Sequence, residues 1–391
     1  MHVRRLQLSS FRNYRELDLT LTPGDLLFLG DNAQGKSNLL EAVHLLATAR
    51  SPRATADTDV ISWQAESMLQ PLARVAATVE RRSGPVQLEA VVTGPGPSLV
   101  GQVQRAGKRL RVNGIPRRAM DLVGQLRAVL FTVDDLDIIS GSPSARRHYL
   151  DVTLSQLDRR YYAALQRYGR VLQQRNAALR RIRDGLAGAD ELTIWDDSLA
   201  REGAVIVAAR LAATNRLAVL ASDAHRELSG DAAEELILAY QPRLGPDWER
   251  LMAADASEAA VERLLAATLV AQRRRDLAAA VSLTGPHRDE ILFTINGAGA
   301  SFASRAQVRT ATLALRLAEG RLLAADPPDP PVLLLDDILS ELDERRRQSV
   351  LDSIREFDQV WFTATSAAGL PDAFLARSTV YHVRAGTVSP A

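Results

Sequence analysis

The chain has 391 residues, of which 46% are hydrophobic and 24% are charged, a balance that suits a globular protein of two or three domains. It contains no cysteine, which excludes disulfides, thiol catalysis and cysteine-ligated zinc, and which fits a reducing compartment. Because the formal net charge is only +1, any nucleic-acid binding must come from a local basic patch.

The beginning of the chain has no targeting signal. Residues 1–11, MHVRRLQLSSF, lack the apolar core of a signal peptide. Elsewhere no uninterrupted apolar run approaches the ~20 residues of a membrane span. We therefore expect a cytoplasmic protein that does not cross a membrane.

Apolar residues recur through residues 3–11 and alternate with polar ones through residues 17–21, which predicts two strands. Between them lies the stretch Phe11-Arg12-Asn13-Tyr14, at a predicted turn. Arg12 is close in sequence to the glycine-rich loop described next. It has two interpretations: a solvated side chain, or a contact to bound nucleotide.

A glycine-rich loop follows a buried strand at Leu26 to Leu29 and precedes a helix at Asn38 to Thr48. Residues 30–37, GDNAQGKS, fit G-x-x-x-x-G-K-[ST], and strand, loop and helix are the context that a P-loop requires. The alternative, a chance glycine turn before a core helix, does not account for that context. Backbone N–H groups of such a loop converge on an anion. We expect Lys36 to reach the β- and γ-phosphates and Ser37 to hold Mg²⁺. The candidate ATP-binding residues here are Gly30, Asp31, Asn32, Ala33, Gln34, Gly35, Lys36, Ser37 and Asn38.

Residues 50–120 are rich in short β segments separated by Gly, Pro and Asn-Gly turns, which predicts an antiparallel sheet. One of these segments runs from Leu99 to Val103. Basic side chains crowd the last hairpin, at Arg105, Lys108, Arg109 and Arg111. They are either solvated surface or contacts to DNA phosphates.

Residues 144–280 are predicted to be mostly helical. Ser142 and Pro143 suit the start of a helix. A heptad spacing through residues 157–182 is broken only by Arg175. Further helices are expected at about 192–228 and 256–280. Arginines on this helical segment, including Arg170, Arg175 and Arg181, form either a solvated face or a DNA-binding face.

The stretch Val332 to Asp337 predicts a buried strand that ends in paired carboxylates. Ligands of open α/β sheets bind at that end of the strands. Asp336 would orient Mg²⁺ through its waters, and Asp337 would polarise the attacking water. The alternative is a solvated acidic turn. The P-loop some 300 residues earlier favours the catalytic interpretation.

Taken in order, these motifs resemble those of the RecF family, bacterial recombination ATPases that belong with the ABC-type heads of SMC-like proteins. The marks of the resemblance are FRNY at 11–14, GDNAQGKSNLLEA at 30–42, DDLDIISGSPSARRHYLD at 134–151, GPHRDE at 285–290, SRAQVRT at 304–310 and LLLDDILSELD at 333–343. The resemblance implies an α/β fold. It places an ABC-type P-loop ATPase head at residues 1–140 and 282–391, and an inserted α-helical arm at residues 141–281.

The resemblance also implies roles for stretches that local chemistry leaves open. Ser304, Arg305, Ala306 and Gln307 look like the signature motif, which contacts ATP bound by a second copy. Ser340 and Asp343 lie in the stretch that looks like the D-loop. Thr365 lies where transporters carry the switch histidine, which makes it a further candidate for binding ATP. Such heads close as a homodimer around two ATP molecules with Mg²⁺. The implied catalytic residues are Lys36, Asp336 and Asp337, with Ser37 and Asp336 on the metal.

Three residues depart from the family pattern: Ala306 and Ala33 stand where the family has glycine, and Val133 where it has proline. Alanine does not readily adopt φ > 0. If the signature loop needs that conformation, Ala306 would weaken the ATP sandwich and slow hydrolysis.

The resulting functional expectation is a RecF-like recombination mediator. It would be a slow, DNA-stimulated ATPase that dimerises with ATP. It would bind duplex DNA or single-strand/duplex junctions, and act with RecR and RecO to load RecA in gap repair, replication and the SOS response. Two alternative functions stay open: an ABC-type transport ATPase subunit, and a nucleotide-gated scaffold with little turnover.

Overall fold

The computed structural model describes residues 1–65, 70–97, 103–230, 234–245, 248–249, 257–325 and 329–391. Most of the strand predicted at Leu99 to Val103 lies outside these residues. The chain forms two compact units. Unit 1 comprises Met1–Asp135, Asp223–Ala232 and Thr312–Ala391, and unit 2 comprises Leu136–Ser222 and Ala233–Ala311. The predicted functional division, at residues 140 and 281, stays a prediction.

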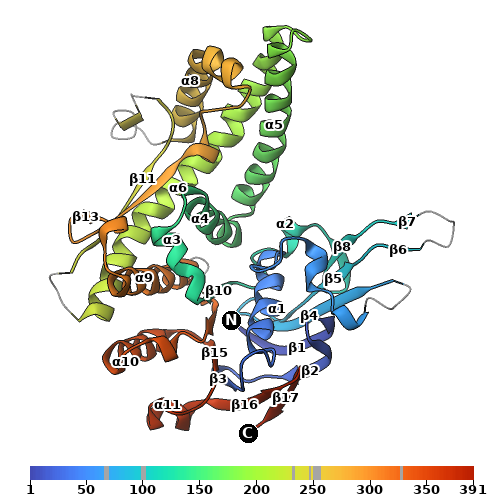
Figure 1. Cartoon of the computed structure of the whole chain (residues 1–391), viewed down its shortest axis with the longest axis vertical. Helices are drawn as coiled ribbons and strands as arrows, with labels where there is room; N and C mark the ends of the chain where they lie inside the picture. Colours follow the sequence, from blue (N-terminus) through green and yellow to red (C-terminus); the bar gives the residue numbers. More distant parts are fainter. Residues whose placement is uncertain (66–69, 98–102, 231–233, 246–247, 250–256, 326–328) are drawn as a thin grey trace. The chain divides into compact units, whose positions relative to one another are not determined.

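A largely parallel sheet forms the centre of unit 1 (Figure 1). Its strand order is β10-β14-β15-β3-β16-β17, and only the last pair is antiparallel. The strands are β3 (Gly24–Leu29), β10 (Ala128–Phe131), β14 (Val332–Asp336), β15 (Gln359–Ala364), β16 (Thr379–Arg384) and β17 (Thr387–Pro390). The central strands read as continuous apolar runs because both faces of a parallel sheet are covered. The strand that precedes the P-loop, β3, and the strand that ends in the two acids, β14, flank β15.

A second sheet of unit 1 is antiparallel, as the sequence predicts, in the order β2-β1-β4-β5-β8-β9. Its strands are β1 (His2–Phe11), β2 (Tyr14–Thr20), β4 (Leu72–Glu80), β5 (Val86–Thr93), β8 (Gly107–Val112) and β9 (Ile115–Arg117). Two short strands, β6 (Gly96–Pro97) and β7 (Val103–Gln104), pair with each other. Helix α1 (Lys36–Thr48) contacts strands of both large sheets, and eleven of its residues are buried. The P-loop therefore lies between two buried elements, β3 before it and α1 after it.

Shorter helices complete unit 1. They are α2 (Ala119–Leu122), α10 (Glu344–Ser353) and α11 (Asp372–Arg377). Helix α10 follows the stretch predicted to be the D-loop, and its N-cap is Asp343, whose side chain accepts a hydrogen bond from the N–H of Arg346. Ordinary helix capping therefore fixes the end of this predicted D-loop.

Unit 2 is mainly helical, as predicted for the arm. Its helices are α3 (Leu136–Ser140), α4 (Pro143–Leu157), α5 (Arg159–Arg183) and α8 (Glu258–Ala279), together with most of α6 (Leu192–Ser229) and the first turns of α9 (Arg305–Ala324). Ser142 caps α4 by accepting from Ala145 N–H, with Pro143 in the first turn, as predicted. A small sheet of β11 (Leu236–Gln241), β12 (Glu290–Ile295) and β13 (Ala298–Gly299) completes the unit.

One segment among the described residues, Ala189–Ser229, is long and apolar enough to cross a membrane by length and composition alone. Half of its most apolar window is buried within the protein. A core helix passes the same test, so the segment gives only weak evidence of a membrane span.

Candidate nucleotide-binding site

The P-loop connects β3 to α1, and its lysine is the first residue of the helix. Lys36 Nζ donates to the carbonyls of Gly30 and Asp31, at 2.5 and 2.8 Å. Burial lowers the pKa of the Lys36 ammonium, whereas Asp337, Asp336 and Asp31 act in the opposite direction. These carboxylates favour the charged form of the partly desolvated ammonium, and a charged donor makes strong hydrogen bonds to a phosphate group.

Two residues of the FRNY stretch, Asn13 and Tyr14, hydrogen-bond to backbone carbonyls of the P-loop, a role that the sequence did not reveal. Asn13 Nδ2 donates to the Gln34 carbonyl at 2.8 Å, and the Tyr14 hydroxyl donates to the Gly35 carbonyl at 3.0 Å. Gly35 has φ 115°, and a Cβ there would lie 2.6 Å from Asn13 Nδ2. Glycine is therefore required at this position for its conformation and for space. The only signal in the sequence was the proximity of FRNY to the loop.

Arg12 is held by protein groups. Its Nη2 lies 2.6 Å from the carboxylate of buried Glu41 on α1, and its Nη1 donates to the Asp59 carbonyl at 2.7 Å. The side chain keeps partial exposure. A contact from Arg12 to nucleotide stays a prediction, and it would require the arginine to share or leave Glu41.

The two predicted metal ligands are in direct contact although they are 299 residues apart. Ser37 Oγ donates to Asp336 Oδ1 at 2.8 Å, and Thr363 Oγ1 donates to the same oxygen at 2.8 Å. A hydroxyl and a carboxylate are oxygen ligands of the kind that Mg²⁺ prefers. Among the described residues no group of three or more His, Cys, Asp or Glu side chains could hold a metal. This donor set fits an ion that phosphate oxygens and water complete.

The second acid, Asp337, has a constrained backbone. Its φ of 54° is left-handed, its N–H donates to Thr363 Oγ1 at 2.9 Å, and Ser340 Oγ donates to its carbonyl and carboxylate at 2.8 and 3.0 Å. Thr363 on β15 thus holds both acids, which the sequence did not indicate. The other predicted residue of this region, Thr365, is exposed just beyond β15.

The proposed signature residues begin α9 in unit 2. Ser304 Oγ accepts from Gln307 N–H at 3.3 Å, and Gln307 Oε1 accepts from Ser304 N–H at 3.0 Å, which is a capping box. Arg305 and Ala306 are exposed in the first helical turn. The concern that Ala306 must adopt φ > 0 is removed here, because this residue is helical. The departure that does require a positive φ is Ala33, at 64°.

The side chains proposed to contact DNA differ in their exposure and in whether an acidic side chain already pairs with them. Arg105, Arg109 and Arg170 are exposed. Arg111 is exposed but paired with Glu89, and Arg181 is exposed but paired with Glu191. Lys108 is bound to the Ala49 carbonyl and to Asp57.

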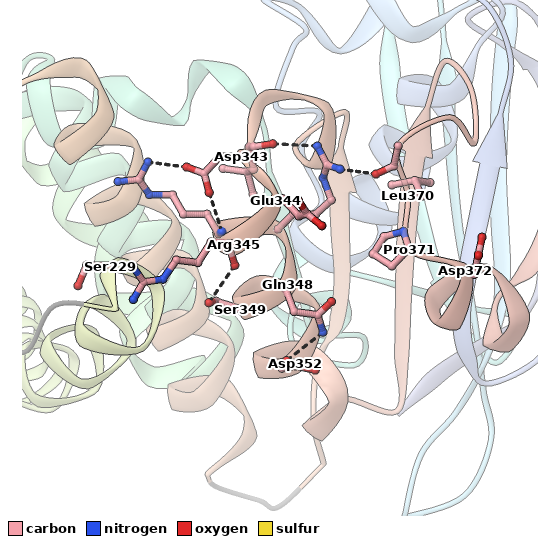
Figure 2. Close-up of a pocket in the computed structure, with 14 residues that line it drawn as sticks. Ser229, Asp343, Glu344, Arg345, Gln348, Ser349, Asp352, Leu370, Pro371 and Asp372 are labelled. Atoms are coloured by element: carbon pink, nitrogen blue, oxygen red, sulfur yellow. Dashed lines mark hydrogen bonds and ion pairs between the residues drawn. The ribbon is translucent and has the colours of Figure 1, made fainter.

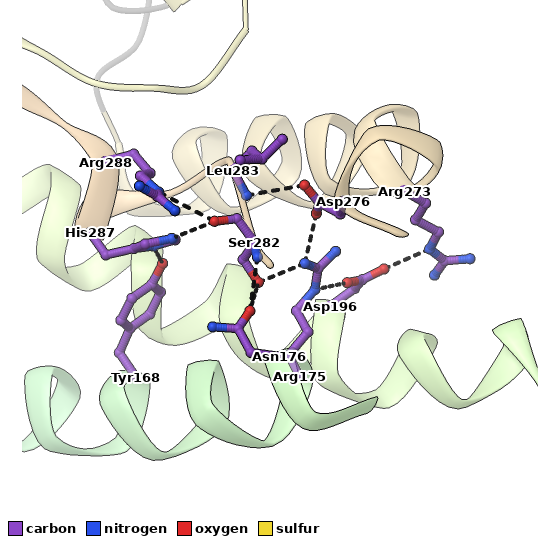
Figure 3. A network of polar contacts seen from close by, with 10 residues as sticks. All are labelled: Tyr168, Arg175, Asn176, Asp196, Arg273, Asp276, Ser282, Leu283, His287 and Arg288. Atoms are coloured by element: carbon purple, nitrogen blue, oxygen red, sulfur yellow. Dashed lines mark hydrogen bonds and ion pairs between the residues drawn. The ribbon is translucent and has the colours of Figure 1, made fainter. Parts of the chain in front are cut away.

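Arg175 requires a correction. Its side chain is completely buried, and it pairs with Asp196 at 2.6 Å and Asp276 at 2.7 Å and donates to Ser282 Oγ at 2.8 Å (Figure 3). The break in the heptad therefore marks a buried ion-pair network that joins α5, α6 and α8. The expectation that Arg175 contacts DNA is wrong for this structure, because its guanidinium is not accessible.

Comparison with known proteins places this site in a family. The model of the RecF/RecN/SMC N-terminal domain matches residues 2–388. The "DNA replication and repair protein RecF" of Chloroflexus aggregans is 43% identical over 394 residues, covering 99% of each chain. That of Roseiflexus castenholzii is 41% identical and covers both chains completely.

Solved structures agree. The recombination mediator protein RecF bound to ATP, described as part of the RecFOR pathway, superposes with a TM-score of 0.85 at 30% identity, covering 100% of this chain and 97% of that one. An Smc head bound to the C-terminal winged-helix domain of ScpA has a TM-score of 0.53 at 15% identity and shares the fold alone. The predicted fold class, an ATPase head with mixed sheets and a helical arm, is confirmed.

Proposed function

The chain belongs to the RecF family, and from that premise we propose that it is an ATPase of DNA replication and recombinational repair. The observation that carries this proposal is the assembly of Lys36, Ser37, Asp336 and Asp337 around one end of the parallel sheet. These residues follow two strands, β3 and β14, and the hydrogen bond from Ser37 to Asp336 joins the two parts of the site. The ATP of a similar solved RecF supports the same ligand.

The residues divide the work of hydrolysis. Lys36 and the loop N–H groups bind the β- and γ-phosphates and neutralise their charge. Ser37 and Asp336 would hold Mg²⁺, which would supply further neutralisation of the phosphate charge. Asp337 accepts a proton from, or orients, the attacking water. Because phosphoryl transfer depends on position and electrostatics, these groups supply the part of the catalytic site that a single chain provides.

A second copy of the chain completes the proposed site. Ser304 to Gln307 would contact the γ-phosphate bound by the opposite subunit, and Ser340 and Asp343 would lie at the interface. ATP would then act as a cross-link between two heads. The helical conformation of Ala306 supports this arrangement, because the exposed first turn of α9 presents N–H groups to an anion. It also removes the sequence argument for a scaffold with little turnover.

The closed dimer would bind duplex DNA or single-strand/duplex junctions and act with RecR and RecO to support RecA loading in the cytoplasm. Two exposed groups of arginines would supply phosphate contacts: Arg105 and Arg109 near the β8–β9 hairpin, and Arg170 and Arg181 on α5. Arg181 is paired with Glu191, so a phosphate would have to replace that partner. Such contacts carry affinity without sequence preference.

Fluorescence anisotropy of a labelled duplex, titrated with protein with and without ATP and Mg²⁺, tests the proposal. We expect binding to tighten with ATP, and Lys36→Ala to lose that gain while keeping the ATP-independent affinity. A matched duplex with a single-stranded extension measures the preference for junctions. Absence of DNA binding in both nucleotide states would overturn the DNA role and favour a transport-type ATPase. DNA binding that ignores ATP would refute nucleotide gating.

A further inference from the structure

A single guanidinium joins the two loops that leave β14 and β15. Arg347 Nε donates to the Leu339 carbonyl at 3.1 Å, Nη2 donates to the Leu342 carbonyl at 2.9 Å, and Nη1 donates to the Gly369 carbonyl. All three of these partners are backbone carbonyls. A planar fork with donors in three directions is a property of arginine that lysine does not share.

The first of these loops supports the proposed catalytic acid. Leu339 and Leu342 bracket Ser340, whose hydroxyl donates to the carboxylate of Asp337 at 3.0 Å. Arg347 therefore fixes residues 339–342, and Ser340 in that segment hydrogen-bonds to Asp337. The three-residue turn that contains Ser340, Leu339–Glu341, is too short to fix its own position through a helix.

The second loop begins immediately after β15. That strand supplies Thr363, which donates to Asp336 and accepts from the N–H of Asp337. The loop then runs past Thr365 to Gly369. Both loops line one open groove beside α10, with Asp343 on one side and Leu370 and Pro371 on the other (Figure 2).

We propose that Arg347 is a positioning residue for ATP hydrolysis. By fixing the D-loop to the loop after β15, it holds Asp337 in register with the phosphate site and links the two loops that a second copy would touch. This inference rests on the proposed ATPase function. It differs from a role in folding alone, because α10 is independently capped by Asp343 and anchored by buried Val350 and Leu351.

The test is Arg347→Lys, which keeps the charge but not the three hydrogen bonds. We expect kcat to fall roughly tenfold to a hundredfold, because small displacements of a catalytic group have effects of that size. We expect the KM for ATP to change less than about twofold, since the P-loop contacts are untouched. The matched control is Arg355→Lys, which alters an exposed arginine paired with Asp352 just beyond α10.

A second readout does not depend on activity. In nucleotide-free protein, amide hydrogen exchange of Arg347→Lys should be faster at residues 339–343 and 366–370 together, and unchanged in α1. If wild-type protein hydrolyses no ATP, the proposed function fails, and this exchange experiment alone decides whether Arg347 couples the loops. Unchanged exchange in both loops would overturn the coupling.

Ser340→Ala keeps the inference falsifiable if Arg347→Lys does not fold. It should reproduce the loss in kcat while leaving exchange at residues 366–370 unchanged. If both variants fold, the double variant should lose no more activity than the worse single one, because both act through Asp337. Additive losses, or a KM increase that accounts for the whole effect of Arg347→Lys, would refute the proposal.

Discussion

At the residue scale, Asp337 directly follows β14 with a left-handed backbone conformation that an aspartate can adopt. A left-handed φ is uncommon outside glycine, but Asp and Asn tolerate it better than other residues. Such strain persists where the surroundings impose it, and it clusters at functional sites. The hydrogen bond from the Asp337 N–H to Thr363 Oγ1 and the one from Ser340 Oγ to the Asp337 carboxylate supply that constraint.

Asp337→Asn therefore tests the chemistry with little change to the backbone. We expect ATP binding and ATP-dependent dimerisation to persist, and hydrolysis to fall at least about a hundredfold, because an amide cannot accept the proton. Single-turnover kinetics with radiolabelled ATP would measure this. Turnover equal to wild type would remove Asp337 from the catalytic set.

The two alanines that replace family glycines should respond oppositely to restoration of glycine. Ala33 has φ 64°, so Ala33→Gly relieves strain of about 1 kcal/mol, offset in part by unfolded-state entropy. Ala306 is helical, so Ala306→Gly should cost up to about 1 kcal/mol. Urea unfolding of the two variants gives the signs. Equal destabilisation by both would contradict this reading.

At the scale of elements, α5 shows that arginines on one helix serve different purposes. Arg175 neutralises two buried carboxylates, whereas Arg170 and Arg181 face solvent. Removing one partner of a buried ion pair leaves an uncompensated charge, which typically costs 3–5 kcal/mol. Arg175 therefore stabilises unit 2. Its substitution would destabilise the protein and so confound any DNA-binding assay.

The salt dependence of DNA binding should separate the two groups. Replacing Arg170 and Arg181 with Gln should lower the slope of log K against log salt by about two, since each phosphate contact contributes about one. The same replacement at Arg105 and Arg109 serves as the comparison. If only the second pair changes the slope, the DNA contacts lie at the hairpin.

The GPHRDE segment anchors α5 by a neutral histidine. Tyr168 hydroxyl and His287 Nδ1 are 2.7 Å apart, and His287 Nε2 lies 3.0 Å from the Ser282 carbonyl (Figure 3). Burial, with smaller contributions from Arg288, Arg147 and Arg175, lowers the pKa of His287 to about 4, although the hydrogen bond with the Ser282 carbonyl acts in the opposite direction. The folded protein thus disfavours the imidazolium.

This shift has a definite consequence for stability. The unfolded chain binds a proton at His287 near pH 6.5, whereas the folded chain does so only near pH 4. The contribution of His287 to the free energy of unfolding is therefore fully present above pH 6.5 and is lost as the pH falls toward 4. This loss amounts to at most about 3 kcal/mol. Urea unfolding at pH 7.5 and pH 5 should show a smaller pH effect in His287→Gln than in His382→Gln, an exposed control. Equal pH effects would be inconsistent with this assignment.

At the scale of the whole molecule, ATP is proposed to join two chains. Lys36→Ala removes the charge on the β- and γ-phosphates, so we expect it to abolish ATP-dependent dimerisation. Size-exclusion chromatography with light scattering, with ATP and Mg²⁺, would measure the mass. Dimers that form normally in this variant would refute the ATP sandwich.

The sequence by itself determined the P-loop, the acidic strand, the antiparallel sheet and the helical segment, because each depends on local spacing and on periods of two or 3.6 residues. Only the tertiary structure decided that Thr363 holds both acids, that Asn13 and Tyr14 brace the loop, and that Arg175 is buried. The residues that make these contacts are between 21 and 101 positions apart in the sequence. Local pattern carries no record of such partners, because a polar side chain reads the same whether water or a buried carboxylate satisfies it.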